Sequence, residues 1–255
     1  MAIVVYLDST IELWVTDVAT GKSKLWAKNL HDALVYNTVE WSPDGSSIYF
    51  ASRVLYREPF RQQSKLPEGP SVQETSGKSA LVRTYQDLLK DVDDERAFEH
   101  YATSCIMKVK ENEEPIMIGN PGIITSFEVS PNSEYILVEQ LMRPFSYIVP
   151  YYRFPTYLAI WNNEVKLFKK LAEIPLAEEI PQGFSAVRTG PRNFQWRADA
   201  PATVVWVEAQ DDGNPKKIAE IRDLMYKLDA PFKEKPTPFL SLNLRYAGIN
   251  WGWDQ

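Results

Sequence analysis

Three arginines in irregular stretches of the chain are its strongest candidates for binding chemistry. Arg188 and Arg192 lie four positions apart in a Gly- and Pro-containing stretch, and Arg143 begins an aromatic-rich stretch that runs to Phe154. A guanidinium group forms paired hydrogen bonds with a carboxylate, so each arginine is a candidate substrate-binding residue for an acidic group. The alternatives are structural. Arg188 and Arg192 would then pair with Glu178–Glu179 or join neighbouring sheets, and the aromatic stretch would line a channel, pack inside the fold or contact a partner domain.

The catalytic and metal-binding motifs that the chain lacks narrow its chemistry further. No Gly-x-Ser-x-Gly nucleophile motif occurs, and neither His31 nor His100 has a second ligand at a metal-binding spacing. Two Gly-Lys-Ser tripeptides lack the upstream glycine of a phosphate-binding loop. The single cysteine, Cys105, lies on an expected strand, where a buried and inert thiol is predicted. We therefore assign no catalytic residue, no metal ligand and no cofactor.

Composition excludes several other classes of protein. The 255 residues carry a net charge of −6, so a basic face for nucleic acid is not expected. One cysteine cannot form an internal disulfide framework. The apolar runs are far shorter than the roughly 20 residues that cross a bilayer, and the N-terminus has neither a signal peptide nor a transit peptide. An intracellular, soluble protein without nucleic-acid or membrane partners is predicted.

A repeated β structure has to position these side chains. Val39-Glu40-Trp41, Phe127-Glu128-Val129 and Phe194-Gln195-Trp196 each precede a turn-forming stretch and then a more continuously apolar strand. A second hairpin follows each of these hairpins, which gives four antiparallel strands per repeat, the blade of a β-propeller. The predicted fold is therefore all-β, a partial β-propeller. We expect an incomplete blade at 1–30, blades at about 37–119, 123–172 and 192–240, and the start of another blade at 245–255.

A loop-plus-helix insertion is predicted at about 53–103. Residues 57–79 are rich in Pro, Gln, Ser and Gly and indicate an extended loop, whereas residues 80–101 have helical spacing. The expected buried face of this helix consists of Leu81, Tyr85, Leu88, Leu89, Val92, Phe98 and Tyr101. The acidic run at 91–95 lacks the glycine and the ligand spacing of a calcium loop, so it is interpreted as a solvated helix face.

Several irregular segments carry a resemblance to a known family. They read GPSVQETSGKSALVRTYQDLL, FEHYATS, RPFSYIVPYYRFP and IPLAEEIPQGFSAVRTGPRNFQWRADAPATVVWVEAQDDGNP. These segments are similar to the N-terminal β-propeller of glutamyl endopeptidases, the plant chloroplast and bacterial group within the prolyl oligopeptidase superfamily. The resemblance runs from the Trp14 hairpin to Gly252 and is weakest at the ends and at 215–240.

The resemblance implies a serine peptidase that cleaves after acidic residues, mainly Glu. Its catalytic triad lies in a C-terminal α/β-hydrolase domain, and its propeller restricts entry to short or unfolded peptides. This chain has no hydrolase domain and no nucleophile motif, so no catalytic residue is carried over to it, and the chain alone is predicted to be inactive. The implied location is the plastid stroma.

Four hypotheses follow. The first is a non-catalytic propeller segment that gates or positions peptide substrate over an α/β-hydrolase domain. The second is a free-standing interaction module that self-associates through exposed blade edges. The third is an independent enzyme with a site around Arg188, Arg192 and His31. The fourth is a truncated, inactive copy.

Overall fold

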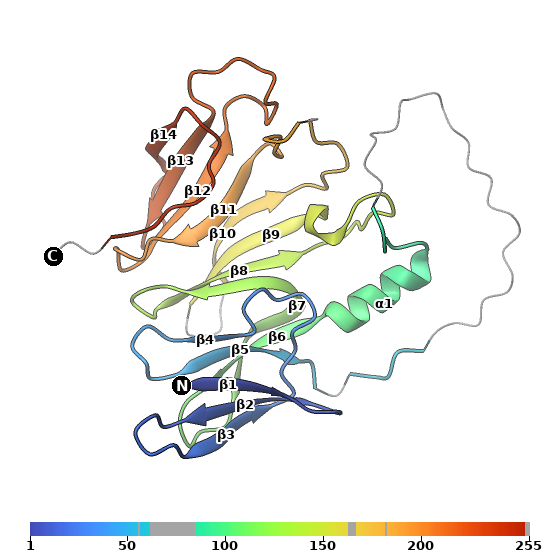
Figure 1. Cartoon of the computed structure of the whole chain (residues 1–255), viewed down its shortest axis with the longest axis vertical. Helices are drawn as coiled ribbons and strands as arrows, with labels where there is room; N and C mark the ends of the chain where they lie inside the picture. Colours follow the sequence, from blue (N-terminus) through green and yellow to red (C-terminus); the bar gives the residue numbers. More distant parts are fainter. Residues whose placement is uncertain (56, 62–84, 163–166, 182, 253–255) are drawn as a thin grey trace, which may run out of the picture.

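The computed structural model describes residues 1–255 except 56, 62–84, 163–166, 182 and 253–255 (Figure 1). Its strands form antiparallel sheets that fan out in an arc. The first sheet has three strands: β1 (Ala2–Tyr6), β2 (Ile11–Thr16) and β3 (Ser23–Lys28). The last has four: β11 (Pro191–Trp196), β12 (Thr203–Ala209), β13 (Asp223–Asp229) and β14 (Thr237–Leu242).

Seven strands lie between these two sheets, in the order β10-β9-β8-β7-β6-β5-β4. They are β4 (Val39–Trp41), β5 (Ile48–Arg53), β6 (Ser104–Val109), β7 (Ile116–Val129), β8 (Tyr135–Leu141), β9 (Thr156–Asn162) and β10 (Leu167–Ile174). The strand β7 pairs with β6 as far as Gly122 and with β8 from Ile123 onward. The seven strands are therefore two four-stranded blades that share β7, and the predicted partial β-propeller is confirmed. We call the four units the first to fourth blades in chain order.

The hydrophobic core lies between neighbouring blades. Leu13 of the first blade packs with Ile48 and Phe50 of the second. Tyr49 and Ile106 of the second pack with side chains of the third, and Ile160 of the third packs with Trp196 of the fourth. Strands with apolar residues on both faces are buried on both sides. Each blade therefore depends on its neighbours, and the continuous apolar runs of the sequence mark the strands inside the stack.

The helix α1 (Val92–Ala102) is shorter than the helix predicted at 80–101. It begins where the Asp91 carboxylate accepts hydrogen bonds from the backbone N–H groups of Asp93 and Asp94, which caps the first turn. The described residues 85–91 are not helical, and 62–84 lie outside the described residues, including Leu81 and most of the predicted loop.

Part of the predicted buried helix face was also wrong. Val92 and Tyr101 are 54% and 58% exposed, whereas Tyr85, Leu89 and Phe98 do pack against buried apolar side chains. Val92 is the first residue after the cap, so its side chain lies at the helix end, outside the apolar stripe. The acidic run forms the cap and the first helical turn, where carboxylates are favoured by the helix dipole.

The described residues 245–252 contain no strand. Tyr246, Ile249 and Trp251 instead pack on Val205, Val207 and Met225 of the fourth blade. Their interpretation as the start of another blade stays a prediction.

Candidate docking face

The connections between strands fall at two ends of the blades. Successive antiparallel strands reverse direction, so the connections within a blade alternate between the ends. Short turns lie at one end, which we call the turn end: 17–22, 42–47, 110–115, 130–134, 197–202 and 230–236. Long connections lie at the other, which we call the connection end: 29–38, 54–103, 142–155, 175–190, 210–222 and 243–252. Figure 1 shows α1 and the connection from β8 to β9 on the same side.

Direct contacts join the connections of successive blades. The N–H of Ala177 donates to the carbonyl of Arg153 at 3.0 Å, and the hydroxyl of Ser146 donates to Glu178 at 2.7 Å. An apolar cluster lies beneath them, in which the ring of Phe98 on α1 meets Phe145 and Phe154 edge-on at 5.2 and 5.9 Å. The long connections therefore form one packed layer, and that layer contains Arg143 and Arg188.

Arg143 is held by α1. Its guanidinium donates to Glu95 at 2.6 Å and to Glu99 at 2.9 Å, and it lies 4.6 Å from the centre of the Phe145 ring. Hydrogen bonds from Arg143 and Tyr147 hold the pKa of Glu95 below its usual range. The sequence predicted that the guanidinium group of Arg143 would bind a substrate carboxylate. In the structure this group binds two carboxylates of the chain itself.

Arg188 and Arg192 have different partners, and neither contacts Glu178 or Glu179 by a hydrogen bond in the part of the chain that the structure describes. Arg188 Nη2 donates to the carbonyl of Pro175 at 2.7 Å, and burial lowers the pKa of its guanidinium. Arg192 forms an ion pair with buried Asp223. Arg188 Nε and Arg192 Nη1 are buried and have no partner among the described residues.

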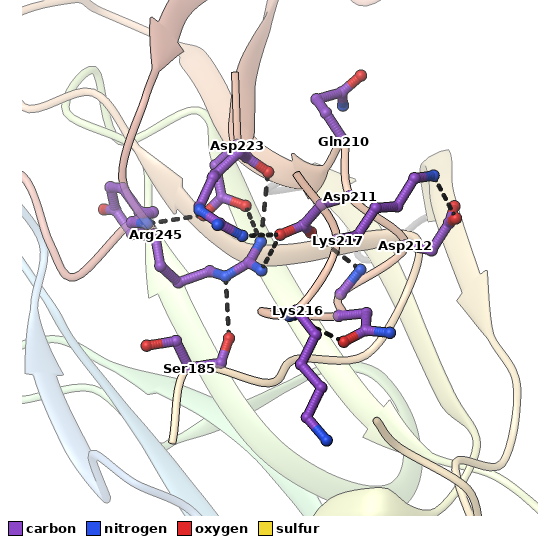
Figure 2. Close-up of polar contacts among 12 residues, drawn as sticks. Ser185, Gln210, Asp211, Asp212, Lys216, Lys217, Asp223 and Arg245 are labelled. Carbon is purple, nitrogen blue, oxygen red and sulfur yellow. Dashed lines mark hydrogen bonds and ion pairs between the residues drawn. The ribbon is translucent and has the colours of Figure 1, made fainter. Parts of the chain in front are cut away.

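Arg192 belongs to a buried ionic cluster that sequence reasoning missed. Asp211 and Asp223 are fully buried, and Arg245 donates to both at 2.6 and 2.7 Å (Figure 2). Arg222 donates to Asp211 at 2.7 Å. Burial by itself would raise the pKa of Asp211, but hydrogen bonds from Arg245 and Arg222 outweigh it and hold that pKa below the usual value. Because these residues are spread from 192 to 245, no local motif signals the cluster.

The cluster ties the segment after β14 to the fourth blade. Arg245 Nε also donates to the carbonyl of Ser185 at 3.1 Å, and the N–H of Tyr246 donates to Asp223 at 2.6 Å. Two carboxylates face three guanidinium groups here. Such a cluster is strongly destabilised when one partner is removed, since an uncompensated charge then stays buried.

A second set of carboxylates lies on the first strands of the blades. Glu40 accepts from the N–H of Val129 at 3.0 Å, and Glu128 accepts from the N–H of Trp196 at 3.2 Å. Each is the middle residue of its blade's repeated three-residue pattern, and each accepts its hydrogen bond from the next blade along the arc. Burial is the main cause that raises the pKa of each carboxyl to about 7, and repulsion by Glu128 is a smaller cause at Glu40. The corresponding residue of the fourth blade, Gln195, donates to the hydroxyl of Tyr246 at 2.7 Å.

The histidines and the cysteine have structural surroundings. His31 Nε2 lies 2.7 Å from the carbonyl oxygen of Tyr101, and His100 lies in the last turn of α1 beside Phe60. Cys105 is buried on β6, and burial raises the pKa of its thiol, as expected for the predicted inert side chain. His31, Arg188 and Arg192 therefore each contact a different part of the fold. Among the described residues no group of three or more His, Cys, Asp or Glu side chains is arranged to hold a metal ion.

Exposed apolar side chains gather at the connection end. Thirteen of the 23 exposed large apolar residues of the described chain lie in the described parts of these long connections: Tyr36, Leu55, Val92, Tyr101, Met142, Tyr147, Ile148, Tyr151, Tyr152, Phe184, Ile218, Ile221 and Leu244. Within the described parts of the turns at the other end, Val18 alone is of this kind. Exposed apolar side chains that gather at one end favour an interaction site there, so the connection end is the candidate docking face.

The chain matches named proteins over most of its length, although no family model matches it. It is 35% identical over 246 residues to a protein named probable glutamyl endopeptidase, chloroplastic, from Oryza sativa subsp. japonica, which covers 94% of this chain and 26% of that protein. A protein of the same name from Arabidopsis thaliana is 34% identical over 244 residues, with 94% and 25% covered.

Solved structures with similar shape include the β-propeller domain of the Trilobed protease from Pyrococcus furiosus, at 12% identity and a TM-score of 0.47, with 94% of this chain and 52% of that chain covered. An acylaminoacyl peptidase from Pyrococcus horikoshii is 13% identical with a TM-score of 0.48, covering 92% and 28%. The chain spans about a quarter of the length of the two plant relatives. Across nearly all of its own length it is similar to the glutamyl endopeptidases, and the resemblance predicted from its irregular segments is confirmed.

Proposed function

We propose that the chain acts as the non-catalytic propeller segment of a glutamyl endopeptidase-like serine peptidase. In this function its connection end docks an α/β-hydrolase domain, and the docked blades limit which peptides enter. The observation that carries the proposal is the asymmetry of the two ends, because the exposed apolar side chains gather at the connection end. A location in the plastid is proposed with it, from the names of the plant relatives. No helix among the described residues is long and apolar enough to span a membrane.

The connection from β8 to β9 is the best-defined part of this face. Tyr147, Ile148, Tyr151 and Tyr152 are all exposed there, and the rings of Tyr151 and Tyr152 meet edge-on at 5.9 Å. Tyrosines provide large, stiff contact areas and are enriched at interface hot spots. The buried side chains of Phe145 and Phe154 beneath them hold the connection in place, so docking would cost little conformational entropy.

Substrate binding by Arg143, Arg188 and Arg192 forms the finer part of the proposal. The unpartnered donors Arg188 Nε and Arg192 Nη1 support a role toward an acidic peptide side chain, since a buried donor without an acceptor costs free energy. Arg143 is the weakest candidate of the three because its guanidinium group already forms ion pairs with Glu95 and Glu99.

Docking is tested by adding the chain to a separately produced hydrolase portion of a plant relative and measuring binding by calorimetry. The variant Ile148→Ser/Tyr152→Ser removes two exposed apolar side chains of the connection end, and Val18→Ser is the matched control at the turn end. We expect binding by the native chain and by the control, with at least a tenfold loss in the double variant. Equal binding by all three proteins would refute the docking face.

Gating is tested in the same mixtures with a short Glu-containing peptide and with a folded protein as substrates. The chain alone should cleave neither substrate. Together with the hydrolase portion it should lower cleavage of the folded protein more than cleavage of the peptide. Serine-reagent-sensitive turnover by the chain alone would overturn the assignment as a non-catalytic segment.

A second candidate function is that of a free-standing module which associates through blade edges. It is favoured by one observation: the first blade has three strands, so β1 has β2 as its one partner in the described sheet.

A further inference from the structure

Two hydrogen bonds join the first strands of the third and fourth blades at the turn end. Glu128 lies next to the end of β7, and Trp196 is the last residue of β11. The backbone N–H of Trp196 donates to the Glu128 carboxyl group at 3.2 Å, and its indole Nε1 donates to the carbonyl oxygen of Glu128 at 2.9 Å. We call these two bonds the clasp. They hold two blades together, because each bond has its donor in one blade and its acceptor in the other.

The clasp lies against an apolar interface. Trp196 is 3% exposed and packs with Leu137 and Ile160 of the third blade, and Leu137 lies directly opposite Glu128 in the sheet. An ionised carboxyl in apolar surroundings costs free energy, since a single N–H group does not replace the water that the carboxylate loses. Burial accordingly raises the pKa of Glu128 to about 7.

The charged groups around the clasp do not compensate the ionised form of Glu128. The two arginines nearest to Trp196 in the chain are paired with aspartates of their own blade. Glu40 of the second blade is a carboxyl like Glu128, and the two repel each other when they are ionised. Loss of the proton therefore places a charge at the interface that these arginines do not neutralise. The titratable side chains on the elements packed against Glu128 are Glu40 on β4, Tyr135 and Glu139 on β8, Arg192 on β11 and Arg197 in the turn after it.

We propose that Glu128 and Trp196 form a proton-dependent clasp between the third and fourth blades. While the Glu128 carboxyl is protonated, its carbonyl oxygen accepts the N–H of Trp196 and no charge is buried, so the clasp stays closed. Once the proton is lost, the carboxylate is stabilised by water, which reaches it when the bond to Trp196 opens. The clasp therefore opens more often as the pH rises, separately from the unfolding of the whole chain.

The clasp lies at the end of the blades away from the candidate docking face. A backbone hydrogen bond of 2.9 Å, from the N–H of Asn132 to the carbonyl of Pro201, joins the two turns that follow the clasped strands. Opening therefore separates the third and fourth blades at the turn end, while the long connections stay in contact at the other end. The proposal rests on contacts within the chain and is independent of the peptidase function, so its test needs no hydrolase domain.

Hydrogen exchange of backbone amides, followed by NMR, tests the clasp in the native chain. The amide of Trp196 reports the clasp, and the amide of Ile160, in the middle of the third blade, reports opening of the blade itself. After correction for the intrinsic pH dependence of exchange, Trp196 should exchange at least tenfold faster than Ile160 at pH 8.5. Its corrected rate should rise about tenfold between pH 6 and pH 8.5, as follows from a carboxyl whose pKa is raised from 4.5 to about 7. Equal corrected rates at both amides would overturn the proposal.

Glu128→Gln is the decisive variant, since glutamine keeps the accepting oxygen and the shape but does not ionise. The corrected rate of Trp196 should then no longer depend on pH, and a rise that persists in this variant would overturn the proposal. Glu40→Gln is the matched control, because it removes the corresponding carboxyl between the second and third blades and should leave most of the rise in place.

The shape of the pH profile covers the case in which Glu128→Gln does not fold. In the native chain the corrected rate of Trp196 should rise below about pH 7 and level off above it, where Glu128 is ionised in the closed clasp as well. A rate that is flat below pH 7, or that continues to rise above pH 8, would assign the opening to another group and refute the clasp.

Discussion

Replacing Glu128 by glutamine is expected to remove part of the pH dependence of stability. Glu128 lies on the first strand of the third blade and accepts a hydrogen bond of 3.2 Å from the N–H of Trp196 in the fourth. Burial raises the pKa of this carboxyl from 4.5 to about 7. Glutamine keeps the shape and the accepting oxygen but never carries charge, and Gln195 already occupies the corresponding position one blade further on.

The sign follows from the number of bound protons. Between pH 4.5 and pH 7 the folded chain holds a proton on Glu128 that the unfolded chain has lost, so the free energy of unfolding falls as the pH rises through this window. The full effect of a shift of this size is about 3 kcal/mol per carboxyl. From pH 6 to pH 8.5, Glu128 alone should lower the free energy of unfolding by about 1.4 kcal/mol. This range lies above the isoelectric point of about 5.2.

Urea unfolding at pH 6 and pH 8.5, followed by tryptophan fluorescence, measures this difference. The loss between the two pH values should be about 1.4 kcal/mol smaller in Glu128→Gln than in the native chain, and about 3 kcal/mol smaller in Glu40→Gln/Glu128→Gln. The control is Glu111→Gln, at an exposed turn position, which should leave the loss unchanged. Identical pH dependence in the native chain and the double variant would refute the claim that these carboxyls are buried and protonated.

Three further predictions concern single side chains. Asp223→Asn should lower the free energy of unfolding by about 3–5 kcal/mol, measured in urea, because it leaves Arg192 and Arg245 buried without their shared carboxylate. Asp91→Ala removes the cap of α1 and should cost about 1 kcal/mol in the same assay, with a small loss of helical circular dichroism. Cys105 should react with a thiol reagent at least a hundredfold more slowly in the native chain than in guanidinium chloride, and fast reaction of the native chain would contradict its burial.

The sequence predicted the blades better than the connections between them. The repeated pattern around Glu40, Glu128 and Gln195, followed by turn residues and an apolar strand, is local and periodic, so it identifies first strands directly. The helix was predicted about twelve residues too early because Leu88 and Leu89 continue its apolar spacing, whereas the Asp91 cap decides where it begins.

The candidate site depended on contacts that no local pattern reports. Arg143 and Arg192 were recognised as arginines placed to hold carboxylates, and they do hold carboxylates, but of Glu95, Glu99 and Asp223 within the chain. Pairing over such distances in sequence is decided by the packing of whole blades. In contrast, the sequence already shows that short turns and long connections alternate between its expected strands. This alternation would have predicted that the end with the long connections exposes more side chains for binding.

The shared strand β7 has a mechanical consequence for the arc. The second and third blades are joined directly where the chain reverses within β7 between Gly122, opposite Ser104, and Ile123, opposite Leu141. The third and fourth blades are joined by residues 175–190, and the first and second by 29–38. We therefore expect any widening or narrowing of the arc to occur mainly at these two joints, with the middle pair of blades moving together. Because 175–190 contains Arg188 and contacts the fourth blade through Val187 and Gly213, bending at that joint would move this arginine.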